Sequence, residues 1–251
     1  MPQKKIDFRA RMSYTIKAMQ IKKSLQYFSP FEWALWLSSV AVITASYLLG
    51  ESFYPLSLIA SVLGVTALLF IAKGNVIGQF LVIIFSTLYG IISYNFRYYG
   101  ELITYLFMTA PSAIFACITW LKNPSKVGRS EVKVATMSAT KWVFVSLFSV
   151  ATTVVFYFIL RYFDTKNLVL STLSVTTSMF ASLLLIFRCR FYAVAYALND
   201  IVLVGLWVLA SIEAPSNLPM VFCFITFLFN DLYSFINWKR LEIKQANEEI
   251  K

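Results

Sequence analysis

The sequence predicts an all-α membrane protein with eight transmembrane helices and both termini in the cytoplasm, and three observations lead to this prediction. The 251-residue chain is 59% hydrophobic and 14% charged, whereas a soluble domain is about half apolar and a quarter charged. Apolar runs of the roughly 20 residues that a bilayer-spanning helix needs recur along the whole chain. Basic residues concentrate in alternate loops. No soluble domain is left over.

The first apolar run follows a basic arm, residues 1–30, and we expect it to be a retained helix. It is long for a signal-peptide core and lacks a small-residue cleavage site. Within the arm, Phe8, Met12, Ile16 and Met19 recur at helical spacing among Lys and Arg. A helix lying on the membrane surface and a disordered basic tail both fit that pattern. In chain order, the expected spans are residues 31–50, 53–72, 75–96, 102–120, 141–160, 169–187, 191–211 and 217–237.

The charge distribution predicts the orientation of these spans. With a cytoplasmic N-terminus, the cytoplasmic segments hold 19 of the 22 Lys and Arg residues, and the opposite side holds Arg97, Arg161 and Lys166. Cytoplasmic loops carry such an excess in most membrane proteins. The net charge of +10 therefore reflects topology and contact with anionic lipid, and we expect no nucleic-acid partner.

Several kinds of chemistry are excluded by residue types. The chain has no histidine, and Cys117, Cys189 and Cys223 are far apart with no CxxC pair. We therefore expect no metal site, redox site or cofactor. No nucleophile is paired with a base, so an enzyme is not expected. A purely structural or partner subunit also has little support, because no large soluble docking surface is present.

Two segments of the chain resemble each other and predict a 1+3+1+3 arrangement. Each contains a tight basic turn, "AKGN" (72–75) or "RCRF" (188–191), and ends in "ITWLKNP" (118–124) or "INWKR" (236–240). Because a single helix separates them, we expect two parallel three-helix repeats related by an axis along the membrane normal. Trp120 and Trp238, each followed closely by Lys, are interpreted as interfacial anchors. The expected units are an extra helix (31–50), a first three-helix bundle (51–124), a loop and linker helix (125–166), a second bundle (167–240) and a cytoplasmic tail (241–251).

Two Asn-Asp pairs stand out in the last two apolar runs, Asn199–Asp200 and Asn230–Asp231. An aspartate at mid-membrane costs on the order of 2.5–3.5 kcal/mol to insert. A single Asn often serves as an interhelical hydrogen bond, but two pairs beside aromatic residues favour a polar cavity for a planar, hydrogen-bonding ligand such as a nucleobase. By contrast, Glu32 and Glu101 lie at expected helix starts, where the helix dipole tolerates them. The candidate binding residues are Asn75, Gln79, Tyr89, Tyr192, Tyr196, Asn199, Asp200, Trp207, Asn230, Asp231 and Ser234.

Three stretches resemble the PnuC family of bacterial vitamin transporters. They are "KGNVIGQFLVIIFSTLYGIISYNFRYYGELI" (73–103), "ITWLKNP" (118–124) and "FLFNDLYSFINWKR" (227–240). The resemblance implies a SWEET-like fold in the bacterial cell membrane, a homotrimer, and facilitated diffusion of a nucleoside-like vitamin precursor that a cytoplasmic kinase traps. Nicotinamide riboside is the usual substrate of the family. Carried over by position, Gln79, Asn199 and Asn230 are the family's binding residues.

One departure from the family pattern leaves the substrate open. Members that carry nicotinamide riboside have a WxxW pair upstream of the Asn in the penultimate helix, and here Tyr192 and Tyr196 stand in that region. The leading hypothesis is a facilitator for an uncharged or weakly charged nucleoside, with nicotinamide riboside as the family default. The alternatives are a deoxyribonucleoside or other nucleoside, thiamine or riboflavin, and proton-coupled transport through Asp200 and Asp231.

Overall fold

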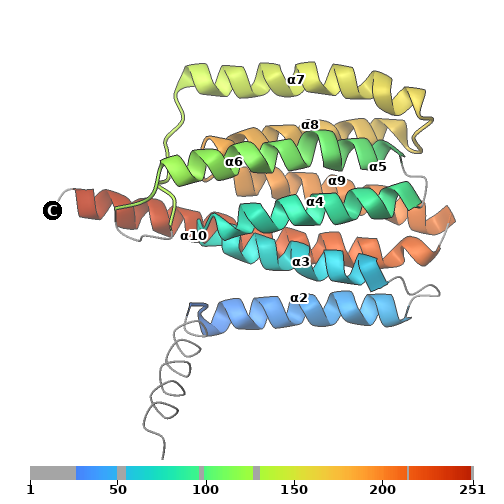
Figure 1. The fold of residues 1–251 in the computed structure, drawn as a ribbon, viewed down its shortest axis with the longest axis horizontal. Helices are drawn as coiled ribbons and strands as arrows, with labels where there is room; N and C mark the ends of the chain where they lie inside the picture. The colour runs from blue at the N-terminus through green and yellow to red at the C-terminus, as the bar shows by residue number, and fades with distance from the viewer. Residues whose placement is uncertain (1–26, 50–54, 96–98, 127–130, 214, 250–251) are drawn as a thin grey trace, which may run out of the picture.

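The chain folds as a bundle of long helices that run roughly along one axis (Figure 1). A computed structural model describes residues 27–49, 55–95, 99–126, 131–213 and 215–249. Residues 1–26 of the expected basic arm lie outside these ranges, so neither interpretation of the arm is tested. In chain order the helices are α2 (Pro30–Leu49), α3 (Pro55–Ala72), α4 (Ile77–Asn95), α5 (Tyr99–Thr104), the π-helix η1 (Tyr105–Thr109), α6 (Ala110–Lys122), α7 (Ala139–Tyr162), α8 (Leu168–Ile186), α9 (Tyr192–Glu213), the 3₁₀-helix η2 (Pro215–Asn217) and α10 (Leu218–Glu249).

The prediction of eight transmembrane helices is confirmed within the described ranges. Eight helical elements are long and apolar enough to cross a membrane, with α5, η1 and α6 together forming one of them. Their bounds lie close to the expected spans except at the C-terminus. There α10 continues to Glu249, so most of the segment expected as a tail, residues 241–251, prolongs the last helix.

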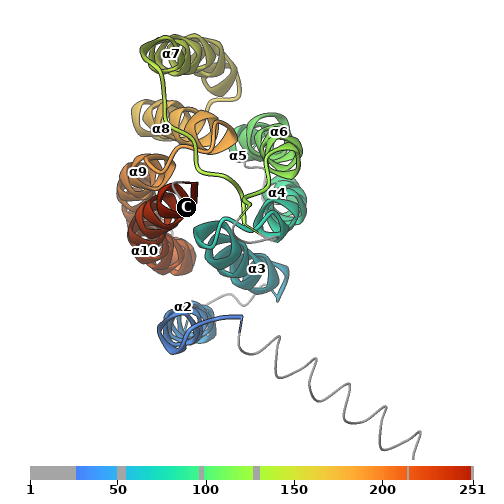
Figure 2. The same ribbon diagram turned by 90° about the vertical axis from the view of Figure 1, so that its left-hand side faces the viewer.

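The helices of the two three-helix groups pack side by side in chain order and close into a ring. Neighbours in contact are α3 with α4, α4 with α6, α6 with α8, α8 with α9, α9 with α10, and α10 with α3. Figure 2, which looks along the helices, shows this ring with α7 outside α8 and α2 outside α3 and α10. The third helix of each three-helix group, α6 or α10, therefore packs against the first helix of the other group.

Local sequence explains where several elements begin and bend. Before α2, Ser29 and Glu32 form a capping box, in which the Glu32 amide donates to Ser29 Oγ at 3.2 Å and the Ser29 amide donates to Glu32 Oε2 at 2.6 Å. The turn of π-helix at Tyr105–Thr109 ends two residues before Pro111, which has no amide hydrogen to continue the α-helical pattern.

The tight turns after α3 and α8 have the same construction. Each contains one residue in the left-handed region, Gly74 with φ 66° and Arg188 with φ 60°. The next amide reaches back five residues, from Asn75 to the Phe70 carbonyl at 3.0 Å and from Cys189 to the Leu184 carbonyl at 2.9 Å. This is the hydrogen bonding of a Schellman motif. We call the end of the bundle that contains these two turns the basic end, because Lys73, Arg188 and Arg190 lie there.

The loop after α6 folds over the basic end and is held at several points. The Val132 amide donates to the Gly74 carbonyl at 2.9 Å. Gln245 of α10 donates to the Val132 carbonyl at 3.0 Å and accepts from the Val134 amide at 2.9 Å. Both valines are buried in the same apolar cluster as Trp120, Trp238 and Leu241. This loop is therefore a packed cover over the end of the ring.

Candidate functional site

A cavity of about 130 Å³ lies inside the ring and is lined by side chains from α3 to α10. In this measure one water occupies about 10–15 Å³, so the space suits a small organic molecule. Its walls combine apolar and aromatic surface, including Phe85, Tyr105 and Phe227, with polar groups from both halves of the chain. Apolar walls with a few placed polar groups are typical of ligand sites.

Six of the candidate residues line this cavity. They are Gln79, Tyr192, Tyr196, Asn199, Asp200 and Asp231. Gln79 comes from α4 in the first group, and the others come from α9 and α10 in the second. The ring thus brings together polar residues that are more than a hundred positions apart in the sequence.

Some of these side chains are fixed by neighbours on α8. Thr177 donates to the Asn199 side-chain oxygen at 2.8 Å, which fixes the rotamer of the amide. The Tyr196 and Ser182 hydroxyls are 2.8 Å apart. Because the Asn199 oxygen is engaged, its amide nitrogen is the group that remains for a ligand. These contacts preorganise one wall of the cavity.

Other groups at the cavity are buried and have no hydrogen-bond partner within the described part of the chain. They include Gln79 Nε2, the Tyr192 hydroxyl, Asp200 Oδ2 and Asp231 Oδ1. Gln79, Tyr192, Asp200 and Asp231 are each at most 3% exposed. Buried polar atoms normally have partners, and those without one need an explanation. Together they offer donors and acceptors to a ligand or to water in the cavity.

Asp200 of α9 and Asp231 of α10 bring two carboxyl groups to the same cavity. One oxygen of each, Asp200 Oδ2 and Asp231 Oδ1, is buried without a hydrogen-bond partner among the described residues. Two carboxylates that share a buried site repel each other, and a proton on one of them relieves this repulsion. The pair therefore behaves as one unit that can hold or release a proton.

The remaining candidate residues lie away from this cavity. The Asn230 amide donates to Ser39 of α2 at 3.1 Å and to the Thr226 carbonyl at 2.8 Å, and Ser234 donates to the Asn230 carbonyl at 2.8 Å. Tyr89 packs on Tyr105 with ring centroids 4.3 Å apart. Asn75 belongs to the turn between α3 and α4, where its side chain accepts from the Ile77 amide at 3.0 Å. Trp207 lines a different cavity.

That second cavity, of about 290 Å³, lies toward the end of the bundle opposite the basic end. It shares Gly100, Glu101, Thr165 and Ser171 with the first cavity. Sequence reasoning missed Glu101, because its place in the first turn of a helix explained its charge without a site. The available signal was the apolar run that follows it, residues 102–120, which contains no basic residue.

Trp120 and Trp238 are not interfacial anchors, and this expectation is wrong. Their side chains are 2% and 0% exposed, and their rings lie 5.5 Å apart between centroids. Trp238 also packs against Tyr192, a cavity residue, at 4.8 Å. The pair lies inside the ring at the basic end, directly beyond the cavity.

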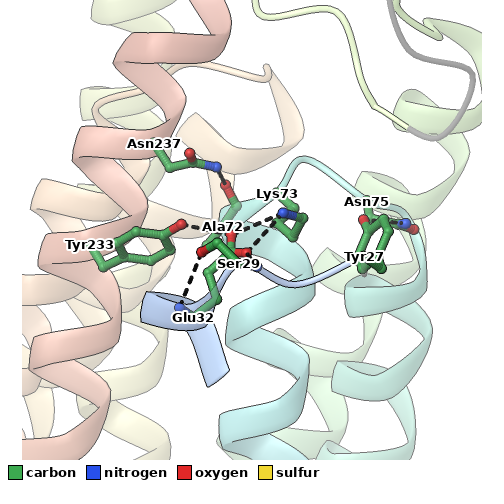
Figure 3. A network of polar contacts seen from close by, with 8 residues as sticks. All are labelled: Tyr27, Ser29, Glu32, Ala72, Lys73, Asn75, Tyr233 and Asn237. Carbon is green, nitrogen blue, oxygen red and sulfur yellow. Dashed lines mark hydrogen bonds and ion pairs between the residues drawn. The ribbon is translucent and has the colours of Figure 1, made fainter. Parts of the chain in front are cut away.

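Glu32, at the start of α2, also has a structural role that the sequence did not predict. Its carboxylate is 2% exposed and accepts from Lys73 Nζ at 3.0 Å to both oxygens and from the Tyr233 hydroxyl at 2.7 Å. Figure 3 shows this network, with Asn237 donating to the Ala72 carbonyl beside it at 2.7 Å. Glu32 thus joins α2 to the α3–α4 turn and to α10. Among the described residues, no group of three or more Asp, Glu and Cys is placed to hold a metal ion.

Comparison with known proteins identifies the family. The family model described as "nicotinamide mononucleotide transporter" matches residues 54–240. A nicotinamide riboside transporter PnuC of Neisseria mucosa is 26% identical over 219 residues, which cover 86% of this chain and 83% of that protein. The PnuC of Haemophilus influenzae is 24% identical over 236 residues, 93% of this chain and 100% of that one.

A solved structure agrees with the fold. A crystal structure of a vitamin B3 transporter PnuC superposes with a TM-score of 0.74 at 24% identity, covering 87% of this chain and 94% of that chain. The eight apolar helices and the bacterial relatives place the protein in the bacterial cell membrane as a multi-pass protein. The resemblance seen in the sequence is confirmed, and the chain belongs to the nicotinamide mononucleotide transporter family, the family of the PnuC membrane transporters.

Proposed function

We propose that this protein carries nicotinamide riboside across the bacterial cell membrane by facilitated diffusion, through the cavity inside the ring. The observation that carries the proposal is this cavity, in which polar groups of both three-helix groups have no hydrogen-bond partner among the described residues. The names of the relatives support the substrate. In this proposal a cytoplasmic kinase traps the riboside after entry, so that net uptake needs no other energy source.

Two carboxamide side chains recognise the ligand in this proposal. Asn199 offers its amide nitrogen because Thr177 already occupies its oxygen. Gln79 offers an amide nitrogen that has no partner in the described part of the chain. The nicotinamide carboxamide and the ribose hydroxyls are matching acceptors. Tyr192 and Tyr196 form aromatic surface in the region where other members carry Trp, which supports stacking on a planar ring. Asn230 instead braces α10 against α2 through Ser39.

The arrangement of the helices supports the finer architecture that the sequence suggested. We propose two parallel SWEET-like repeats, α3 to α6 and α8 to α10, joined by α7 and preceded by α2. The equivalent turns at Gly74 and Arg188 and the reciprocal packing of α6 on α8 and α10 on α3 support it. The basic end faces the cytoplasm by the charge rule. A homotrimer remains part of the proposal by family resemblance.

The test is uptake into proteoliposomes containing the purified full-length chain. We expect saturable uptake of labelled nicotinamide riboside that stops at the external concentration, because the liposomes contain no kinase. Asn199→Ala and Gln79→Ala should each weaken apparent affinity by about tenfold, the value of one buried hydrogen bond. Asn247→Ala, on the exposed end of α10, is the matched control and should behave as wild type. Absence of saturable uptake would refute the proposal.

Proton-coupled transport is a second candidate, and the Asp200–Asp231 pair favours it. The two carboxyl groups line the same cavity, where protonation and ligand binding can influence each other. Coupling predicts accumulation of substrate above the external concentration when a pH gradient is imposed. Uptake by wild type that equilibrates without accumulation, whatever the gradient, would rule it out.

A further inference from the structure

Among the residues that the structure describes, three acidic side chains and no basic one line the cavity. Glu101, Asp200 and Asp231 all line it, and no lysine or arginine in the described ranges does. Lys166 lines only the second cavity, where it pairs with Glu213. The ion pairs found among the described residues use Glu32, Glu131, Glu213 and Glu242, and none uses the three cavity acids. The acidic side chains of the cavity therefore have no basic partner in the described part of the chain.

Buried acids without a counter-charge need either a proton or a cation. An ionised carboxylate inside the membrane is costly unless it has a partner. Asp200 and Asp231 are 3% and 2% exposed, and one oxygen of each has no hydrogen-bond partner. With a single proton between them, the pair keeps one negative charge inside the bundle. A positively charged ligand would supply the missing partner.

The other walls of the cavity are also suited to a cation. Phe85, Tyr105 and Phe227 lie on the side formed by α4, η1 and α10. Phe85 contacts both other rings, with centroids 5.8 Å from Tyr105 and 6.4 Å from Phe227. The faces of aromatic rings attract cations. An aromatic cluster in the same cavity as the carboxylates suits a flat ring that carries a positive charge.

We propose that the cavity selects a planar organic cation over neutral nucleosides, with Glu101 and the Asp200–Asp231 pair as the counter-charge. The inference rests on the proposed function and specifies its substrate class. Nicotinamide riboside is such a cation because its pyridinium nitrogen carries a charge, and thiamine is another through its thiazolium ring. Riboflavin and the deoxynucleosides are neutral and are disfavoured. The ligand is thus a cation, in contrast to the uncharged or weakly charged nucleoside expected from sequence.

The test compares ligands of nearly equal shape and different charge. The purified chain is titrated with nicotinamide riboside, its neutral 1,4-dihydro form, thiamine and inosine, and binding is measured by calorimetry. We expect nicotinamide riboside to bind at least tenfold more tightly than its dihydro form. Glu101→Gln and Asp200→Asn should reduce that ratio, because each should weaken binding of the charged riboside more than binding of the dihydro form. Retained dihydro binding also shows that the variants are folded.

The outcomes separate this inference from the proposed function. Equal affinity for the charged and neutral ribosides would overturn the counter-charge and leave nicotinamide riboside transport standing. Binding of thiamine with neither riboside would support the counter-charge and overturn the substrate. A ratio unchanged in both variants would also overturn the inference, since the charge preference would then come from other groups. Binding of none of the four ligands would overturn both.

At the basic end of the ring, two indole hydrogen bonds join the two three-helix groups. The Trp120 indole nitrogen of α6 donates to the Leu185 carbonyl of α8 at 3.1 Å. The Trp238 indole nitrogen of α10 donates to the Ile71 carbonyl of α3 at 2.9 Å. Each bond therefore crosses from one three-helix group to the other, at the two interfaces that close the ring.

The two acceptor carbonyls are at equivalent places. Ile71 and Leu185 each precede the left-handed residue of their turn by three positions, and their carbonyls also accept the amides of Gly74 at 2.8 Å and Arg188 at 2.9 Å. The side chains of Ile71, Leu185 and Tyr192 line the cavity. The Trp pair lies directly beyond them, beneath the covering loop. The Trp238 ring contacts the ring of the cavity residue Tyr192, with centroids 4.8 Å apart.

We infer that Trp120 and Trp238 form the gate of the transport path at the basic end, held shut by these two reciprocal hydrogen bonds. Trp120→Phe and Trp238→Phe keep an aromatic ring and remove the indole N–H. Trp36→Phe is the matched control, because Trp36 donates its indole N–H to Thr66 at 3.0 Å outside the ring. The three variants lose the same kind of bond at different places.

Accessibility of the cavity tests the gate without a ligand. In a background with Cys117, Cys189 and Cys223 replaced by Ala, Ser182→Cys places a thiol at the cavity wall. A membrane-impermeant cationic thiol reagent is applied from the basic side of oriented vesicles. Each gate variant should raise the labelling rate at least fivefold, and Trp36→Phe should not. Equal rates in all backgrounds would overturn the gate, and the melting temperature of each variant checks folding.

Discussion

The buried carboxylate of Glu32 should be a strong determinant of stability, because it joins α2 to both halves of the ring. It accepts hydrogen bonds from Lys73, Tyr233 and the Ser29 amide (Figure 3). Glu32→Gln preserves shape and removes the charge, which leaves Lys73 facing a neutral amide. Removing one partner of a buried ion pair costs about 3–5 kcal/mol. Lys73 is 22% exposed and recovers part of its hydration, so we expect the lower end, about 3 kcal/mol.

This magnitude is large enough to measure by thermal unfolding. For a chain of this size 1 kcal/mol shifts the melting temperature by about 2–4 °C, so Glu32→Gln in detergent should lower it by roughly 6–12 °C. Lys73→Met should have a similar effect. Combining both should cost less than the sum by about 1–3 kcal/mol, because the second substitution removes the unpaired partner left by the first. Tyr233→Phe should cost about 1.5–3 kcal/mol, the value of a hydrogen bond to a charged group.

The double-mutant cycle also provides the refutation. If the effects of Glu32→Gln and Lys73→Met add without coupling, the two groups do not stabilise each other, and the network in Figure 3 is not what holds α2. A Glu32→Gln chain melting within about 1 °C of wild type would lead to the same conclusion. Ligand affinity should be unchanged in all of these variants, because none of Glu32, Lys73 and Tyr233 lines the cavity.

Three further predictions test packing at other places. Gly78→Ala should destabilise the chain by about 1–3 kcal/mol, because the added methyl would lie 2.7 Å from the Ile71 amide nitrogen, whereas Gly205→Ala has no atom within 4 Å and should melt like wild type. Gln245→Leu removes both bonds to the covering loop and should speed limited proteolysis between α6 and α7. Burial raises the pKa of the Cys189 thiol, so its thiolate is scarce at neutral pH. Labelling of Cys189 by maleimide, read by peptide mass spectrometry, should therefore be slow at pH 7 and become faster as the pH rises. Rapid labelling at pH 7 would contradict the burial.

The spans were predictable because insertion into a bilayer depends on length and apolarity, which the sequence shows directly. The end of α10 was not, because the residues after Trp238 are polar and their helix is stabilised by tertiary contacts. Gln245 bonds to the covering loop, and Arg190 of the α8–α9 turn pairs with Glu242. The local pattern of charges does not indicate which distant residues will contact the end of α10. The same limit applies to Trp120 and Trp238, whose hydrogen-bond acceptors lie in distant helices.

The candidate site was predictable in part, because helical periodicity groups residues on a face without saying which face meets the cavity. Adjacent residues in an α-helix point about 100° apart. In α10 this separates Asp231, at the cavity, from Asn230, which reaches Ser39 of α2. In α9 the cavity borders a wider part of the helix surface, so the adjacent residues Asn199 and Asp200 both line it. The packing of the ring decides between these outcomes.

The position of Glu101 connects the charge of the cavity with its closure. The Trp pair blocks the basic end, while the second cavity adjoins the first at Glu101 on the opposite side. A solute entering through the second cavity therefore meets Glu101 before the Asp200–Asp231 pair. Attraction between charges strengthens away from bulk water. A cation is therefore stabilised more strongly as it moves inward, and a neutral nucleoside is not. Charge selection thus begins at the mouth of the cavity, before any contact with Gln79 or Asn199.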